Sequence, residues 1–279
     1  MANPFGTLYN PISIHHLLKS AVDVMMPANN EYIVNQDVHY HYQFHSSFSA
    51  LDKPTLKKKI KDSLQIFNQF LKTSNYLIIT YGSAFVYIQN ELDMVVANCH
   101  KMPASHFSKH LLTVEVITDS FFHIYRKLKS FNPNLKIILT VSPVRHLKDT
   151  IELNSVSKST LRLACHQLVA KFGVDYFPAY EIMMDDLRDY RFYKTDRIHP
   201  TQEAEEYIWN KFSEKYFDQG TKDFLETWRE IKTALAHRPS YPTTASHQTF
   251  LKSVLKKLES VNTKVNVNGE INLVRSQLI

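Results

Sequence analysis

The segment "LKIILTVSP" (135–143) decides the fold class of this chain. It is a short apolar run, rich in β-branched residues, without strict alternation of polar and apolar side chains. Such a run is typical of a parallel strand that helices cover on both faces. The segment "NYLIITYG" (75–82) has the same character, and "VDYFPAY" (174–180) is a weaker third example. The sequence therefore predicts a mainly parallel sheet.

Amphipathic helices are predicted before, between and after these strands, over 53–74, 113–133, 155–173 and 201–217. In the first of them, residues three or four apart form one apolar face, namely Leu56, Ile60, Leu64, Phe67 and Leu71. Alternation of helices and strands predicts a layered α/β domain. In such a domain, ligands bind outside the carboxyl ends of the strands.

The chain divides by pattern into two parts. We expect one α/β domain over 1–217 and a helical extension over 218–279. The extension contains two helical patterns joined by a loop rich in Pro, Ser and Thr (238–245), and its last residues are polar and weakly patterned. We expect the chemistry to lie in the first part.

The composition is that of a globular protein and excludes several classes. The chain has 279 residues, of which 44% are hydrophobic and 22% charged. Its two cysteines exclude a disulfide framework and favour a reducing compartment. No apolar run reaches the roughly 18 residues of a membrane span, and the first residues do not resemble a signal peptide. We therefore expect a cytoplasmic protein without a membrane partner.

The net charge of +6 is modest and scattered along the chain. Its densest basic run, "KPTLKKKIKD" (53–62), fits the solvated face of a helix. A nucleic-acid groove would need a longer basic stripe with exposed aromatic residues. We therefore expect no nucleic-acid partner. The hypothesis that the protein binds nucleic acid would rest on its net charge alone.

One polar pair lies in the region expected to carry a site. Asp196 and His199 are three residues apart in "YRFYKTDRIHPTQEAEEYIW" (190–209), just before a predicted helix. A lone Asp-x-x-His arises often by chance, and it also fits a capping loop. Because this loop follows a predicted strand, its position favours a chemical role.

Several segments resemble the GSCFA family, which is similar to a branch of the SGNH/GDSL hydrolase superfamily. They are "NPFGTLYNPISI" (3–14), "ITYGSAFVY" (79–87), "VANCHKMP" (96–103), "LTVSPVRHLKD" (139–149) and "DYFPAYEIMMDDLRDYRFYKTDRIHP" (175–200). The resemblance covers roughly residues 3 to 217 and implies a flavodoxin-like, three-layer α/β/α sandwich. It implies an ester hydrolase that needs no metal or organic cofactor.

The resemblance also implies roles for individual residues. His199 would be the general base and Asp196 the acid that orients it. Asn98, Gly6 and Gly82 would form the oxyanion hole. Such a set is needed because serine is a weak nucleophile until an imidazole takes its proton, and the oxyanion then needs fixed donors.

The sequence departs from the family at one important place. It contains no Gly-Ser-Cys-Phe-Ala block, whose serine matches the nucleophile of the superfamily. The serine in "YGSAF" (81–85) occupies the third-strand position instead. We therefore expect a missing first, central strand, through N-terminal truncation or natural loss, and little serine-dependent esterase activity from the chain as printed.

Cys99, His100, Ser142 and Arg145 are predicted to line the pocket, although packing and capping roles fit Ser142 and Arg145 equally well. A metal site at Cys99 and His100 is disfavoured because adjacent residues lack the spaced ligand pairs of zinc sites. Cys99 as a nucleophile would need a base that faces it. Ser46 and Ser47 are remote alternatives as nucleophiles.

Two functional hypotheses remain open from the sequence. One is an SGNH-like hydrolase of O-acyl esters, including acylated carbohydrates. The alternative is a non-catalytic module that binds a small molecule or a glycan in the pocket of a former hydrolase.

Overall fold

The computed structural model describes residues 1–148 and 150–279. It divides into two compact units, Met1–Ile208 and Trp209–Ile279, which are described separately below. The division falls inside the helix α6 (Gln202–Tyr216), a few residues before the predicted domain boundary.

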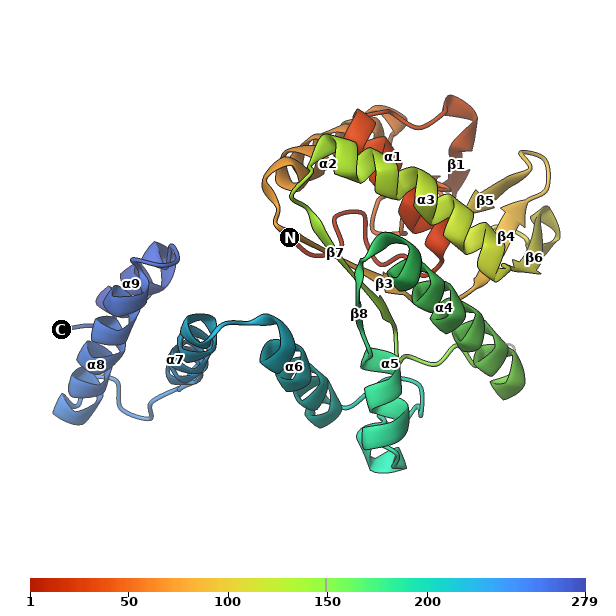
Figure 1. The fold of residues 1–279 in the computed structure, drawn as a ribbon. Coiled ribbons are helices and arrows are strands. Elements are labelled where there is room, and N and C mark those ends of the chain that lie inside the picture. The colour runs from red at the N-terminus through yellow and green to blue at the C-terminus, as the bar shows by residue number, and fades with distance from the viewer. Residues whose placement is uncertain (149) are drawn as a thin grey trace. The chain divides into compact units, whose positions relative to one another are not determined.

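The central element of the first unit is a three-stranded parallel sheet with the order β3-β7-β8. The strands are β3 (Tyr76–Tyr81), β7 (Lys136–Val141) and β8 (Asp175–Phe177), and they lie side by side in Figure 1. In the register of β3 and β7, Ile79 is opposite Leu139. All three strands coincide with apolar runs in the sequence, and the predicted α/β class is confirmed.

One face of this sheet packs into the main hydrophobic core. The inward side chains of β3 and β7 belong to the same buried cluster as the apolar faces of four helices. These helices are α1 (Pro11–Asp23), α2 (Lys53–Thr73), α3 (Val114–Phe131) and α4 (Ile151–Phe172). Helices α2, α3 and α4 were predicted, whereas α1 was not. Burial of an apolar stripe supplies most of the stability of a helix in a protein.

The opposite face of the sheet is only partly covered. On β7, Ile138 and Thr140 are buried, whereas on β3 the side chains of Tyr76 and Ile78 are 47% and 50% exposed. Within the described residues, β3 pairs with β7 alone. The predicted three-layer, flavodoxin-like sandwich is therefore not established, and the missing central strand stays a prediction.

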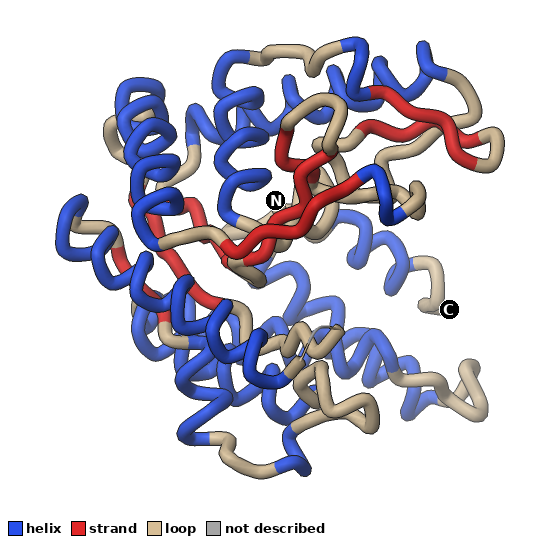
Figure 2. Tube along the Cα trace, turned by 90° about the vertical axis from the view of Figure 1, so that its right-hand side faces the viewer, coloured by secondary structure: helices blue, strands red, loops and turns tan. Residues whose placement is uncertain are grey.

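The other strands are antiparallel and form two further small sheets that the sequence analysis did not predict. A hairpin joins β1 (Tyr32–Asn35) to β2 (Val38–His41), and its two turn residues, Gln36 and Asp37, have positive φ. A second sheet has the order β5-β4-β6, from β4 (Phe85–Gln89), β5 (Met94–Val96) and β6 (Phe107–Leu111). Figure 2 shows all of these strands in red. Strands β2 and β6 mix polar with apolar residues, and β5 has only three residues, whereas β4 is an apolar run that was not predicted as a strand.

Short helical turns connect the longer elements. They are η1 (Asn29–Glu31), η2 (Ala104–His106), α5 (Ala179–Glu181), the π-helical turn η3 (Ile182–Asp186) and η4 (Tyr190–Phe192). Helix ends follow ordinary capping rules. The Asp52 carboxylate accepts a hydrogen bond from the Thr55 N–H at the start of α2. Helix α4 ends at Gly173 with φ of 63°.

The second unit is helical and has a core of its own. It contains the end of α6 and the helices α7 (Gln219–Ala236), α8 (Ala245–Val261) and α9 (Asn268–Arg275). Helix α9 was not expected in a polar segment. It forms because Ile271 and Val274, three residues apart, share one face that is buried against Leu258 and its neighbours.

Across residues 1–148 and 150–279, none of the helices combines the length and hydropathy that a bilayer crossing requires.

Candidate functional site

Asp196 and His199 meet in a tight turn between η4 and α6. The His199 Nδ1 atom lies 2.7 Å from the Asp196 Oδ2 atom. The side chains are 54% and 43% exposed. The turn places a carboxylate and an imidazole in direct contact where solvent and a ligand can reach them.

The backbone of the turn fixes the carboxylate. The second oxygen, Oδ1, accepts hydrogen bonds from the N–H groups of Ile198 and His199, at 2.8 and 3.0 Å. The bond from the His199 N–H is the largest cause that lowers the pKa of Asp196 to about 2, followed by the bond from the imidazole. The carboxylate therefore stays ionised over the working range of most enzymes.

An ionised carboxylate selects one tautomer of the imidazole. A proton on Nδ1 is donated to Asp196, and Nε2 then carries the lone pair. Within the described chain, Nε2 of His199 has no intramolecular hydrogen bond. This is the arrangement that a general base requires.

Arg145 connects this turn to the loop that follows β7. Its backbone N–H donates to the Ile198 carbonyl, and its Nη1 donates to the Arg197 carbonyl, both at 3.3 Å. Its guanidinium carbon lies 4.0 Å from the centre of the Tyr193 ring. The structure thus brings Arg145 and the Asp196–His199 turn together.

A buried lysine joins the carboxyl ends of β3 and β7. The Lys158 ammonium, on α4, donates to the carbonyls of Gly82 and Ser142 at 2.6 and 2.7 Å. Burial lowers the pKa of Lys158 to about 7. Lys158 therefore ties together the two strand ends where a site was expected.

Ser142 has a structural place in the same region. Its hydroxyl accepts a hydrogen bond from the Val144 N–H at 3.2 Å, and its backbone N–H donates to the Tyr81 carbonyl. Among the described residues, no hydrogen bond joins a serine hydroxyl to His199. The Ser142 hydroxyl therefore caps the loop after β7.

The three predicted oxyanion donors differ in availability. The Gly6 N–H donates to the Asn3 carbonyl at 2.9 Å, and the Gly82 N–H donates to the Tyr9 carbonyl at 2.7 Å. Both groups are therefore already engaged. Gly6 has a φ of 78°, and an added Cβ would lie 2.3 Å from the His45 Cβ, which explains the glycine sterically.

The side-chain NH₂ group of Asn98 remains available to donate hydrogen bonds. Its Oδ1 accepts the N–H of His100 at 2.8 Å, which orients the side-chain amide. In the part of the chain that the structure describes, the Nδ2 group makes no hydrogen bond. Of the three residues, Asn98 best fits a donor to a ligand.

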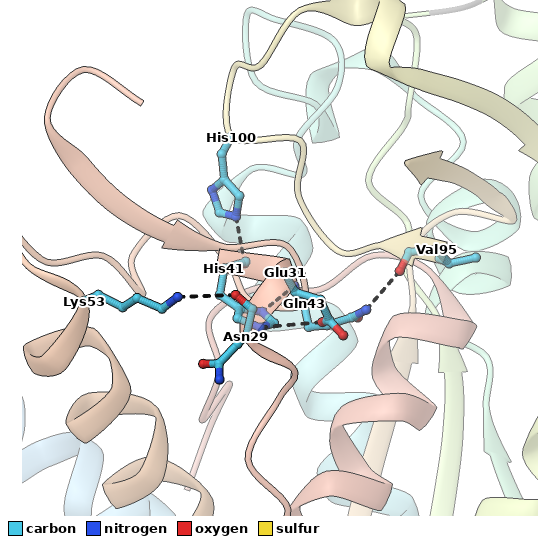
Figure 3. Close-up of polar contacts among 7 residues, drawn as sticks. All are labelled: Asn29, Glu31, His41, Gln43, Lys53, Val95 and His100. Carbon is cyan, nitrogen blue, oxygen red and sulfur yellow. Dashed lines mark hydrogen bonds and ion pairs between the residues drawn. The ribbon is translucent and has the colours of Figure 1, made fainter. Parts of the chain in front are cut away.

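Cys99 and His100 lie in a different setting. Burial raises the pKa of Cys99, and the charge of Lys148 partly opposes this shift. A raised pKa disfavours the reactive thiolate. His100 is buried and donates from Nε2 to the His41 carbonyl at 2.9 Å, as Figure 3 shows. Both observations fit packing roles.

His41 and Glu31 form a second histidine–carboxylate pair (Figure 3). The His41 Nε2 atom is 3.5 Å from the Glu31 Oε2 atom, and the His41 side chain is fully buried. Its Nδ1 accepts the Gln43 N–H at 3.1 Å. Burial lowers the pKa of His41 to about 3 and raises the pKa of Glu31.

No group of three or more metal-ligating side chains occurs within residues 1–148 and 150–279. The predicted pocket residues Cys99 and His100 therefore gain no further ligands from the described fold.

Sequence reasoning missed Lys158 and Tyr193. Lys158 continues the buried face of α4 that contains Leu161, Cys165 and Leu168. A lysine at that helical spacing is the signal that could have identified it, because a buried lysine needs a specific reason. Tyr193 gave no comparable signal among many neighbouring aromatic residues.

Comparison with family models gives two matches. The GSCFA family model covers residues 1–212. The chain belongs to the GSCFA family. The model of the GSCFA domain protein, C-terminal domain, covers residues 228–279. No curated protein and no solved structure matches the chain.

The two family matches cover nearly all of the printed sequence and therefore give no support to the expected N-terminal truncation. They confirm the family on which the sequence analysis relied.

Proposed function

We propose that this GSCFA protein is an SGNH-like hydrolase of small O-acyl esters, including acylated carbohydrates. The observation that carries the proposal is the 2.7 Å contact between Nδ1 of the exposed His199 and the Asp196 carboxylate. The turn also touches Arg145, in the loop at the carboxyl end of β7. Parallel α/β sheets bind ligands at this end.

In the proposed reaction, Nε2 of His199 takes a proton from the attacking water while a bond forms between the water oxygen and the acyl carbon. Asp196 stabilises the resulting imidazolium and holds its orientation. The imidazolium then returns the proton to the alcohol oxygen as the ester C–O bond breaks. The products are a carboxylic acid and an alcohol.

The tetrahedral intermediate needs a donor for its negative oxygen. We assign this task to the Nδ2 group of Asn98, whose Oδ1 is fixed by the His100 N–H. A fixed amide donor costs little reorganisation during the reaction, and loss of one such donor typically lowers the rate by about 10²–10³-fold.

A second function is favoured by one specific observation. In the described residues, no serine hydroxyl is hydrogen-bonded to His199. A protein that binds an acyl compound or a glycan without cleaving it would need no such contact. We keep this binding function as the alternative.

The test is hydrolysis of 4-nitrophenyl acetate by the chain and by His199→Ala, with His123→Ala as a matched control. His123 is an exposed histidine on α3. We expect His199→Ala to lose about 10²–10⁴-fold in rate, the usual contribution of a general base. The control should retain the parent rate.

Equal rates for the parent and His199→Ala would show that His199 is not the base. A parent rate no higher than that of buffer would contradict the hydrolase and favour the binding function.

A further inference from the structure

We propose that a small cavity beside the π-helical turn η3 is the subsite for an acyl group of about the size of a benzene ring. The cavity has a volume of about 160 Å³, and its walls include Arg145, Met183, Met184, Leu187, Tyr190 and Tyr193. The inference rests on the proposed hydrolase and specifies its substrate: esters of small, neutral, apolar acids.

The residues deep in the cavity are buried, and the residues at its rim are more exposed to solvent. Met183, Leu187 and Tyr193 are almost fully buried, whereas Met184 and Tyr190 are 37% and 65% exposed. Small apolar groups gain free energy when they leave water for such a surface. The two methionines also adapt their shape easily to a ligand.

The local backbone explains why a cavity exists here. The Leu187 N–H donates to the Ile182 carbonyl at 3.0 Å, five residues earlier in the chain. This bond closes the wide turn of a π-helix, which is rare and is found frequently at functional sites. The turn carries Met183 and Met184, two of the cavity walls.

The cavity and the Asp196–His199 turn share walls and hydrogen bonds. Arg145 lines the cavity and also donates to the carbonyls of Arg197 and Ile198. Tyr193 lines the cavity, and the next residue, Lys194, donates its N–H to the His199 carbonyl at 2.8 Å. A group held in the cavity therefore lies against residues that are hydrogen-bonded to the Asp196–His199 turn or adjacent to residues that are.

The charges around the cavity favour a neutral occupant. The Arg188 guanidinium pairs with Asp185 at 2.9 Å, and the Asp189 carboxylate accepts the backbone N–H of Arg191 at 2.8 Å. The Arg145 guanidinium stacks on Tyr193 and donates to a backbone carbonyl. The two arginines, Arg145 and Arg188, and the two aspartates, Asp185 and Asp189, balance in charge, and the remaining contact surface is methionine, leucine and tyrosine.

The volume sets the size of the acyl group. A dry, apolar cavity of about 150 Å³ in a protein can hold benzene. A cavity of about 160 Å³ therefore accepts a benzoyl group or a short alkyl chain. A fused ring system exceeds this volume and would extend past the exposed rim.

The test uses amides, because they are not cleaved and the result does not depend on activity. The chain is prepared with ¹³C-methyl methionine, and its methyl signals are followed by NMR during titration with benzamide. We expect saturable shifts of the Met183 and Met184 signals. At equal concentration, 1-naphthamide and the anion benzoate should bind at least tenfold more weakly.

A substitution at the rim locates the ligand without disturbing the core. Met184→Trp, at a partly exposed position, should weaken benzamide binding at least tenfold. Met25→Trp, at an exposed position outside the cavity, should leave binding unchanged. Absent shifts, equal binding to Met184→Trp, or tighter binding of 1-naphthamide or benzoate would each overturn the subsite.

The subsite and the hydrolase can fail separately. If benzamide binds as expected while His199→Ala hydrolyses esters at the parent rate, the proposed function is wrong and the cavity remains a ligand site. If His199→Ala is inactive while benzamide leaves Met183 and Met184 unchanged, the subsite alone is wrong.

Discussion

The first unit contains two histidine–carboxylate pairs that share their chemistry and differ in their surroundings. His199 and Asp196 are about half exposed and lie 2.7 Å apart. The His41 side chain is fully buried, and the Glu31 side chain, at 3.5 Å, is 14% exposed. The pKa of Asp196 is lowered to about 2 by hydrogen bonds from His199, whereas burial raises the pKa of Glu31.

The difference shows that contact between a histidine and a carboxylate does not by itself make a candidate general base. In the exposed turn, two backbone N–H groups hold the carboxylate in its charged form, and the charge orients the imidazole. In the buried pair, desolvation penalises both charged forms, so His41 serves packing. Accessibility and backbone donors separate a candidate base from a structural histidine.

The largest expected effect is on stability, from His41→Ala. The substitution removes a buried ring and leaves the Gln43 N–H without its acceptor. We expect the free energy of unfolding of this unit to fall by about 2–4 kcal/mol. Urea unfolding followed by near-UV circular dichroism of tyrosine is suitable, because both tryptophans lie in Trp209–Ile279.

His199→Ala is the matched control for this experiment. An exposed histidine outside the core should change the free energy of unfolding by less than about 0.5 kcal/mol. If both substitutions cost the same, the proposed division between a structural and a catalytic pair fails.

A second effect on stability, spread over several pH units, is expected from pH. Burial lowers the pKa of both His15 and His41 to about 3, below the value of 6.5 for an unfolded histidine. Between about pH 3 and 6.5 the unfolded chain therefore binds more protons than the folded chain, and stability falls as pH falls through this window. Each histidine contributes a slope of about 1.4 kcal/mol per pH unit.

The measurement is the urea midpoint of the first unit at several pH values between 4 and 7. His41→Gln should reduce the slope of stability against pH by the contribution of one titrating histidine, about 1.4 kcal/mol per pH unit. An unchanged slope would mean that His41 titrates in the folded state as it does in the unfolded state, against the expected effect of burial.

Much of the fold could be predicted from the sequence. The strands β3 and β7 were visible because a strand in a parallel sheet is a continuous apolar run, and α2 to α4 were visible because their buried faces repeat every three to four residues. The antiparallel strands β4, β5 and β6 were not predicted: β5 has only three residues and β6 mixes polar with apolar residues, whereas β4 is an apolar run. Sheet layering depends on pairing between distant segments.

The candidate site was predictable only in part. The Asp196–His199 spacing was visible, and its hydrogen bond depends on a local turn of four residues. The N–H groups of Gly6 and Gly82 are hydrogen-bonded to the carbonyls of Asn3 and Tyr9, and the spacing of residues in the sequence does not predict these bonds. The contacts of Lys158 with two strand ends likewise appear only after folding.

The most direct test of the account is the rate of 4-nitrophenyl acetate hydrolysis by Asp196→Asn, with the His199 tautomer read by ¹⁵N NMR. The asparagine oxygen can still accept the two backbone N–H groups of the turn, but its NH₂ cannot accept the Nδ1 proton. We predict that the proton moves to Nε2 and that the rate falls at least tenfold. An unchanged rate with Nε2 protonated would contradict the assignment of His199 as the base.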